Sequence, residues 1–407
     1  MAGVTVKPDA IQDAARKLRV LHVSPYYAPA WGYGGIVESV SQLARHLALA
    51  GAEVRVLTTD ANGSRRLSER EMINESPIEE TCYCARRLAK SFAPSMLTRL
   101  PAMVRWADIV HLHAVYSFPT LPTLACARIL NRPLAWTPRG ALQRWQGSRR
   151  VALKTVWDRV AAAVSPSRMT LHLTSEQEAR ECAGYFPNAA RIVVGNGVQI
   201  PERVARSQAA DKLRVGFIGR LDPKKGIENL LEACAIIAER KTISLSLAIA
   251  GSGAPAYEQK LSRRVADLAQ SCDVTMSAEV RGDAKEAWFA ARDLVVVPSF
   301  TENFGNVVAE ALVREVPVIA SRGTPWQGLD EHGCGLWVAN DPESLAAAIE
   351  RIASMPLAEM GARGRAWMLE QYSWERCAHD MIVCYEEILR PTGRAAAQVA
   401  GSVRSAL

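Results

Sequence analysis

Glu302 and Glu310 are the two residues in this chain whose types and spacing best suit chemistry on a bound ligand. The apolar, β-branched run 293–298 before them ends in a proline and predicts a buried parallel strand. Apolar residues at helical spacing follow, so a helix should begin near Gly305, with Glu302 in the loop and Glu310 on the helix. The free N–H groups at that helix end can seat an anion, and a carboxylate on the helix can accept hydrogen bonds from a vicinal diol. By themselves, two such glutamates are more often solvated surface charges.

A second loop collects positive charge. Residues 213–219 predict a strand, and the loop after it carries Arg220, Lys224 and Lys225 before a helix with one apolar face. Open α/β sheets bind ligands at the carboxyl ends of their strands, where arginine can contact two phosphate oxygens at once and lysine acts as a point charge. The pattern favours a phosphate site, and a solvated basic turn is the alternative.

The N-terminal half repeats the order of strand, loop and helix. A strand at 18–24 runs into a loop that ends at Gly34 and Gly35, and a helix and then a strand at 53–58 follow, which predicts a βαβ unit. Glycines at this position let the backbone approach a ligand. The spacing is not Gly-x-Gly-x-x-Gly directly after the strand, however, which argues against a dinucleotide-binding site.

Two histidines occupy the next predicted strand, 108–113. His111 and His113 fall on the same face because strand side chains alternate. A metal site is one interpretation, but the sequence offers no third ligand nearby, so no metal site is predicted.

The composition suits a two-domain protein. The chain has 407 residues, enough for two domains of roughly 180 to 200 residues, and no stretch of 18 uninterrupted apolar residues that would predict a transmembrane helix. The first residues contain no apolar signal core, and nine scattered cysteines suit reduced thiols, so a cytoplasmic protein is expected. The net charge of +7 suits anionic small molecules, an anionic membrane surface or nucleic acid. The basic, aromatic-bearing stretch 139–159 could lie at a membrane interface, although a solvated helix face is more common.

Together these motifs resemble those of the retaining nucleotide-sugar glycosyltransferases called family 4. The pair Glu302 and Glu310 matches the Glu-x7-Glu signature of that family, and the stretch 219–226 matches its phosphate loop. The resemblance implies an α/β fold class with two Rossmann-like domains, the GT-B fold, facing across an interdomain cleft. It divides the chain into an acceptor-binding domain at 1–200, a linker at 201–211, a donor-binding domain at 212–372, and, at 373–407, a helix that crosses back to the first domain and a tail.

The resemblance also implies roles for the residues at matching positions. The expected catalytic residues are Glu302, Arg220, Lys225 and Arg139. The expected donor-binding residues are Gly34, Gly35, Arg220, Lys225, Arg281, Glu302, Asn303, Phe304, Gly305 and Glu310. His113 and Arg139 are expected on the acceptor side, where many relatives carry a histidine near the transferred sugar and this chain offers Arg139. No metal ligand is expected.

The expected function is that of a retaining glycosyltransferase. It would move a hexose from a nucleotide-diphosphate sugar to a glycan or polyprenyl-linked acceptor in polysaccharide or lipopolysaccharide biosynthesis, with peripheral membrane association as an option. Arg220 and Lys225 would neutralise the leaving diphosphate, so no cofactor is expected. The alternatives are a nucleotide-sugar epimerase or sugar-phosphate-processing enzyme on the same fold, and a nucleotide-sugar-binding protein without catalysis. A basic nucleic-acid binder comes third, because no aromatic stacking motif accompanies the basic residues, and nucleic acid is not an expected partner.

Overall fold

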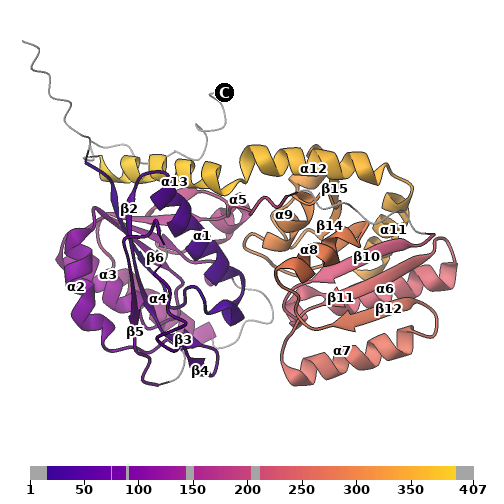
Figure 1. The fold of residues 1–407 in the computed structure, drawn as a ribbon, viewed down its shortest axis with the longest axis horizontal. Helices are drawn as coiled ribbons and strands as arrows, with labels where there is room; N and C mark the ends of the chain where they lie inside the picture. The colour runs from indigo at the N-terminus through magenta and orange to yellow at the C-terminus, as the bar shows by residue number, and fades with distance from the viewer. Residues whose placement is uncertain (1–15, 75, 89–90, 144–150, 203–210, 391–407) are drawn as a thin grey trace, which may run out of the picture.

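The fold consists of two lobes, each built around a parallel sheet (Figure 1). The computed structural model describes residues 16–74, 76–88, 91–143, 151–202 and 211–390. Most of the linker expected at 201–211 and the end of the segment 373–407 lie outside these ranges. None of the described helices combines the length and apolarity needed to cross a bilayer.

The first lobe contains a seven-stranded sheet in which all paired strands are parallel. Its strands in spatial order are β5 (Glu80–Cys84), β2 (Glu53–Thr59), β1 (Arg19–Val23), β6 (Ile109–His113), β7 (Leu134–Thr137), β8 (Met169–Leu173) and β9 (Ala190–Val193). A small antiparallel pair, β3 (Ala61–Asn62) and β4 (Arg65–Arg66), extends from the loop after β2. The helices of this lobe are η1 (Trp31–Tyr33), α1 (Gly35–Leu49), α2 (Met96–Trp106), α3 (Thr120–Ile129), α4 (Val151–Val164) and α5 (Glu176–Glu181).

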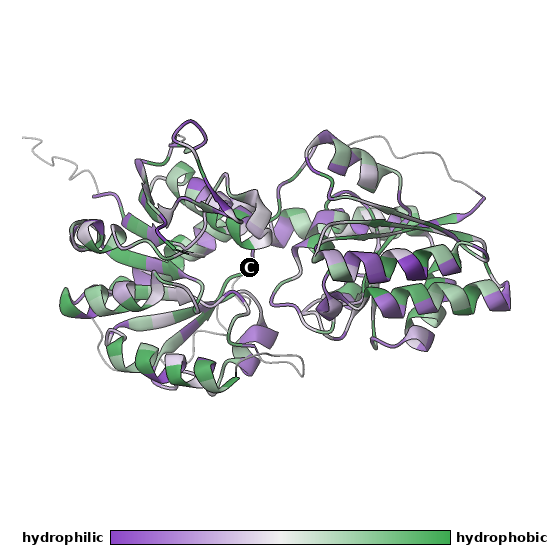
Figure 2. Cartoon of the chain, turned by 90° about the horizontal axis from the view of Figure 1, so that it is seen from below, coloured by the Kyte–Doolittle hydropathy of each residue, from purple (hydrophilic) through white to green (hydrophobic). Residues whose placement is uncertain are grey.

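Neighbouring residues of a strand point to opposite faces of the sheet and pack against different layers of helices. Leu21 of β1 packs in one cluster with α2, α3 and α4, whereas its neighbour Val20 packs in another with α1 and the C-terminal helix α13 (Trp374–Leu389). Because both faces are covered, the central strands are mostly apolar apart from buried histidines, and much of the sheet appears green in Figure 2.

The second lobe contains a six-stranded parallel sheet. Its strands in spatial order are β12 (Asp273–Ser277), β11 (Leu245–Ala250), β10 (Leu213–Ile218), β13 (Leu294–Val297), β14 (Val318–Ser321) and β15 (Gly335–Val338). Its helices are η2 (Pro223–Lys225), α6 (Ile227–Arg240), α7 (Pro255–Leu268), α8 (Asp283–Ala290), α9 (Asn306–Leu312), α10 (Gly328–Glu331), α11 (Pro342–Ala353) and α12 (Leu357–Gln371).

The strand order of each sheet reverses at one point. In the first sheet the chain builds outward from β1 through β2 to β5 and then returns to β6 on the other side of β1. In the second it builds from β10 through β11 to β12 and returns to β13. Ligands of open α/β sheets bind at such switch points, outside the carboxyl ends of the strands. The loops after β10 and β13 are those that carry the cations and Glu302.

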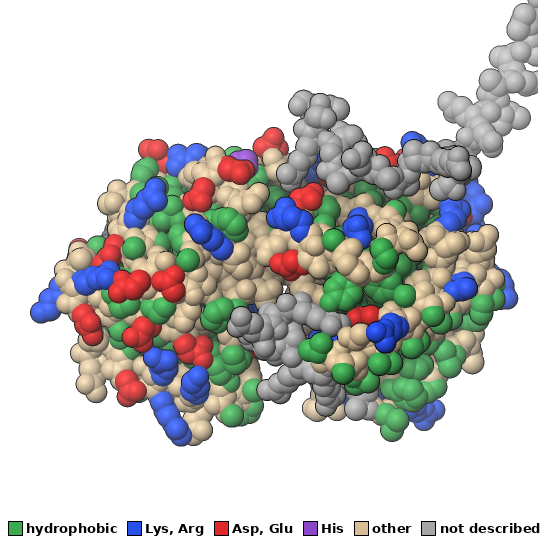
Figure 3. Space-filling view, turned by 180° about the vertical axis from the view of Figure 1, so that it is seen from behind, with side chains coloured by type: hydrophobic (Ala, Val, Ile, Leu, Met, Phe, Trp, Pro, Cys, Tyr) green, Lys and Arg blue, Asp and Glu red, His purple; other side chains and the backbone are tan. Residues whose placement is uncertain are grey.

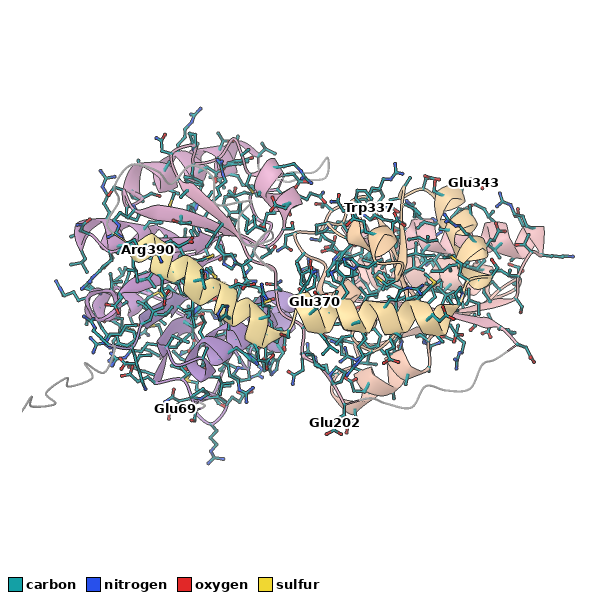
Figure 4. The ribbon with its side chains drawn as sticks, turned by 90° about the horizontal axis from the view of Figure 1, so that it is seen from above. Glu69, Glu202, Trp337, Glu343, Glu370 and Arg390 are labelled. Atoms are coloured by element: carbon teal, nitrogen blue, oxygen red, sulfur yellow. The ribbon has the colours of Figure 1, made fainter. Side chains whose placement is uncertain are left out.

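The chain finally returns to the first lobe through α13. Figure 4 shows α12 and α13 one after the other: α12 lies along the second lobe and ends near Glu370, and α13 runs on across the first lobe to Arg390. In the first lobe α13 packs against α1, and the hydroxyl of Tyr385 lies 2.6 Å from Nδ1 of His111 in β6. The side chain of Arg168 donates to the carbonyl of Ile388 at 2.6 Å. The last helix therefore completes the core of the first lobe.

Candidate active site

The two loops at the switch point of the second sheet pack directly against each other. Asp222 caps η2 by accepting a hydrogen bond from the Lys224 N–H at 3.1 Å, and the Phe300 N–H donates to the Lys224 carbonyl at 2.8 Å. Gly226 has a φ of 64°, and a Cβ atom there would lie 2.0 Å from the carbonyl oxygen of Pro298. Only glycine fits where the loops cross, so the backbone fixes the two loops against each other.

Lys225 and Glu302, one from each loop, form an ion pair in which the carboxylate is buried and the lysine partly buried. The hydroxyl of Ser299 also donates to Glu302, at 2.8 Å. Burial alone would raise the pKa of Glu302, but the charges of Lys225 and Lys224 and the two hydrogen bonds outweigh it and hold that pKa below its usual value. Glu302 is therefore an ionised carboxylate at neutral pH with a lysine held against it.

Arg220 is held far less tightly. Its side chain is 64% exposed, and its ion pair with Asp222 is 4.0 Å long. A contact of this length in solvent contributes little to stability, so the guanidinium is free to turn toward an anion. The neighbouring Lys224 is partly buried, and burial lowers its pKa.

Glu310 projects from α9 and pairs with Lys285 of α8 at 2.9 Å. Both side chains are partly exposed, so further lone pairs of the carboxylate can accept hydrogen bonds from hydroxyl groups. The helix begins at Asn306, and Gly305 is its N-cap with a φ of 79°. Glu302 thus lies in the loop and Glu310 on the helix, as the sequence predicts.

The loop that follows Glu302 lies against the first lobe. The carbonyl of Asn303 accepts a hydrogen bond from the hydroxyl of Ser175 at 2.9 Å. Phe304 is buried against Trp326, whose indole N–H donates to the Phe304 carbonyl. The side chain of Phe304 therefore anchors the loop, and what remains for a ligand at that residue is backbone.

The paired glycines of the first lobe stand opposite this loop. Gly34 has a φ of 72°, and a Cβ atom on Gly35 would lie 3.1 Å from Nδ2 of Asn306. The same amide nitrogen lies 3.5 Å from the hydroxyl of Ser39 in α1. The absence of a side chain at Gly35 thus lets the start of α1 approach the start of α9.

Arg139 is connected to the start of α9 through Asn196. It is partly buried with a φ of 56°, and its Nη1 donates to Oδ1 of Asn196 at 2.6 Å. The Asn196 amide in turn donates to Oδ1 of Asn306 at 3.0 Å. Burial lowers the pKa of Arg139 to about 10, so it stays a cation at neutral pH. The guanidinium is therefore linked through one asparagine to the first residue of α9, and its expected contact with the sugar stays a prediction.

His111 and His113 belong to a larger buried cluster. One ring nitrogen from each of His22, His111 and His113 falls within 4.8 Å of the others. The expectation that no third possible ligand accompanies His111 and His113 is therefore wrong. The parallel pairing of β1 with β6 brings His22 beside them from about 90 positions earlier in the chain.

The cluster nevertheless fits a metal ion poorly. His22 Nδ1 and His113 Nε2 already share a hydrogen bond of 2.9 Å, and His111 Nδ1 bonds to Tyr385. Burial and then the charge of Arg139 lower the pKa of His22 to about 3. A metal ion would have to break these hydrogen bonds and lie near a buried guanidinium, so the geometry favours a cluster of neutral, mutually bonded rings. His113, expected on the acceptor side, is fully buried within it.

Solved structures share this two-lobed arrangement. Sucrose-phosphate synthase from Thermosynechococcus elongatus matches with a TM-score of 0.71 at 21% identity, over 91% of this chain and 99% of that one. The Anabaena protein HepE in complex with UDP-glucose matches with a TM-score of 0.66 at 18% identity, over 91% of this chain and 100% of that one. At sequence identities this low, the matches show that the fold is shared.

Two family models match the sequence, one on each lobe. The glycosyl transferase 4-like domain matches residues 34–197, and glycosyl transferases group 1 match residues 212–355. The chain is a group 1 glycosyltransferase of the GT-B fold. A D-inositol 3-phosphate glycosyltransferase of Paenarthrobacter aurescens is 25% identical over 90% of this chain and 96% of the relative. An uncharacterized glycosyltransferase of Methanocaldococcus jannaschii is 31% identical, but over 45% of this chain, and the chain spans about half of that relative, 47%.

The side chain of Arg281 in the glycosyltransferase contacts the first lobe. It is exposed, pairs with Glu279 at 2.6 Å, and donates to the carbonyl of Trp31 in the first lobe at 3.3 Å. It therefore bridges the two lobes, and a contact with the donor stays a prediction.

Sequence reasoning missed Glu178 of the glycosyltransferase. Its buried carboxylate accepts hydrogen bonds from the N–H groups of Gly140 and Thr174, each at 2.7 Å, and so ties together the loops after β7 and β8. Burial raises its pKa. The pattern Ser175-x-x-Glu178 is a capping-box signature, and Ser175 does cap α5, so the sequence held a signal for the helix start but none for the buried carboxylate.

Proposed function

We propose that this glycosyltransferase moves a hexose from a nucleoside diphosphate sugar to a hydroxyl group of a glycan or lipid-linked acceptor, with retention at the anomeric carbon. The observation that carries the proposal is the ion pair of Lys225 with the ionised Glu302 at the switch point of the second sheet, in the same loop as the exposed Arg220. Structures of HepE contain UDP and UDP-glucose, which supports a nucleotide sugar as the donor.

Each residue has a role in the proposed reaction. As the bond from the anomeric carbon to the diphosphate breaks, negative charge grows on the leaving phosphate, where Arg220 and Lys225 stabilise it. Glu302 accepts hydrogen bonds from hydroxyls of the donor sugar, and Glu310 accepts them from the ribose diol. The acceptor oxygen forms the new bond on the same face, and its proton passes to the leaving diphosphate.

The proposed reaction uses no cofactor, because two cations of the protein do what a divalent ion would do for the diphosphate. EDTA should therefore leave the initial rate of transfer nearly unchanged. Complete loss of activity on chelation, restored by added manganese, would show that the diphosphate is held by a metal.

We place the reaction in the cytoplasm. All nine cysteines lie among the described residues and are free thiols, which suits a reducing compartment.

A donor screen followed by product analysis tests the proposal. Melting temperatures with a panel of nucleotide sugars should rise for one donor, and incubation of that donor with candidate acceptors should yield a glycoside whose anomeric configuration, read by NMR, is that of the donor. An epimerised nucleotide sugar formed without acceptor would support an epimerase instead. Tight donor binding that is never followed by turnover would support a binding protein.

A further inference from the structure

Positive charge is concentrated in one stretch of the first lobe. Residues 85–157 contain twelve Lys or Arg and a single acidic residue, Asp108. The whole chain has 49 basic and 42 acidic residues, so 37 basic and 41 acidic residues remain outside this stretch. The net positive charge of the protein therefore arises entirely from 85–157. Asp108 itself is neutralised by Arg16 at 2.7 Å.

Exposed apolar side chains are concentrated in almost the same stretch. Among the described residues, eight of the eleven large apolar side chains that are exposed lie between positions 88 and 160, namely Leu88, Phe92, Leu97, Ile129, Val151, Leu153, Val156 and Val160. Leu153, Val156 and Val160 recur at helical spacing on α4, so they form one exposed apolar stripe. Leu153 is 62% and Ile129 81% exposed, which is far more than a core-facing residue allows.

Six of these eight side chains belong to one connected layer of helices, the α2–α4 face, and Leu88 and Phe92 precede α2 in the chain. α3 packs against both α2 and α4. Arg132, just after α3, donates to the carbonyl of Arg105 in α2 at 2.7 Å, and the ammonium of Lys154 in α4 lies 5.0 Å from the centre of the Tyr116 ring. Figure 3 shows the rear of the molecule, where the first lobe, on the right, presents green and blue side chains with little red.

We propose that the α2–α4 face docks on an anionic lipid bilayer. Helices that lie in a membrane interface combine exposed aliphatic side chains, which enter the boundary between headgroups and acyl chains, with Lys and Arg, which pair with anionic headgroups. Both features coincide on this face, where Arg99 and Arg105 of α2, Arg128 of α3 and Lys154 of α4 accompany the aliphatic side chains, and the second lobe lacks the basic excess. A nucleic acid would pair with the cations but would leave the aliphatic stripe in water, so it fits the face less well.

Docking by this face leaves the reaction site open. The α2–α4 face covers one side of the first sheet, whereas the loops after β1, β6 and β7 leave the carboxyl edge of that sheet and α13 covers the opposite side. A membrane-bound enzyme could thus still take up donor from solution while the first lobe stays close to a lipid surface. The inference goes beyond the proposed transfer reaction and does not depend on the identity of the donor.

Vesicle sedimentation with the full chain tests the inference. Vesicles of phosphatidylglycerol and phosphatidylcholine should pull down the protein, vesicles of phosphatidylcholine alone should not, and added salt should weaken the binding. The triple variant Leu153→Gln, Val156→Gln and Val160→Gln should lose most of the bound fraction. Arg159→Glu should weaken binding roughly five- to twentyfold, since it removes one favourable charge and adds a repelled one at the lipid surface.

Matched substitutions elsewhere provide the controls. Leu369→Gln changes a 43% exposed leucine of α12, and Arg263→Glu reverses an exposed charge of α7; both should bind vesicles as the unchanged protein does. Equal melting temperatures for all variants would show that none is unfolded. The inference is overturned if anionic vesicles do not bind, if the triple variant binds as well as its control, or if a single-stranded RNA binds more tightly than the vesicles and loses binding with Arg159→Glu.

Discussion

Arg220 and Lys225 carry the same charge in the same loop, yet the protein holds them differently. Lys225 is partly buried and pairs with the buried Glu302, so replacing it would also leave a buried carboxylate without its partner, which typically costs about 3–5 kcal/mol of stability. Arg220 is exposed and makes only a 4.0 Å contact, so its replacement tests the chemistry with little effect on folding.

Arg220→Ala should therefore lower turnover at saturating donor roughly 100- to 1000-fold, the usual effect of removing one preorganised group that stabilises transition-state charge. The melting temperature without donor should stay nearly the same. Steady-state kinetics and thermal unfolding measure the two quantities, with Arg263→Ala, an exposed arginine of α7, as the control. Near-normal turnover would show that the diphosphate is not held by this loop.

Glu310→Gln should act on the Michaelis constant of the donor more than on turnover. Hydrogen bonds to a charged group are worth about 1.5–3 kcal/mol, and a ribose contact persists unchanged through the reaction, so the loss falls on binding. Initial rates over a range of donor concentrations separate the two constants. A collapsed turnover with an unchanged Michaelis constant would place Glu310 at the reacting bond instead.

At the scale of elements, the first lobe depends on a helix from the far end of the chain. Tyr385 of α13 is buried and lies against His111 of β6, so Tyr385→Phe leaves a buried ring nitrogen without a partner. The expected loss is about 1–3 kcal/mol in the free energy of unfolding. Urea denaturation measures it, and His379→Gln on the exposed side of the same helix should change stability by less than about 0.5 kcal/mol. Equal stability of both variants would mean that the hydroxyl contributes nothing to the docking of α13.

At the scale of the whole molecule, the buried histidines make stability depend on pH. Burial, chiefly, lowers the pKa values of His22 and His172 to about 3 from the ordinary 6.5. The unfolded chain therefore binds protons that the folded chain excludes, and stability is fully present above pH 6.5 and falls as the pH drops toward 3. Between pH 7 and pH 5.5, each of these two rings should lower the free energy of unfolding by about 1 kcal/mol. His111 and His113, whose pKa values are also lowered, add to this loss.

Urea denaturation at pH 7 and pH 5.5 tests this dependence. His22→Asn should reduce the pH dependence by about one quarter, because one of four buried rings no longer titrates, whatever it does to stability at pH 7. If the natural protein has the same urea midpoint at pH 7 and at pH 5.5, the rings are protonated, or accessible to protons, in the folded state.

Local patterns in the sequence were enough to predict the central strands and the loops that carry the site. The runs that became β1, β6, β10 and β13 are apolar because helices cover both faces, and the glycines and cations follow at their carboxyl ends. The edge strand β12 gave no such signal, because it is largely exposed and polar, so its sequence resembles a loop.

The sequence by itself determined which residue types stand at the ends of which strands, because strand and helix periods and turn residues act over a few positions. Only the tertiary structure decided which of these residues meet. Lys225 pairs with Glu302 across 77 positions, and His22 bonds to His113 across 91, because parallel strands join distant segments through crossover connections. Pairings of that kind depend on strand order, and no local pattern encodes it.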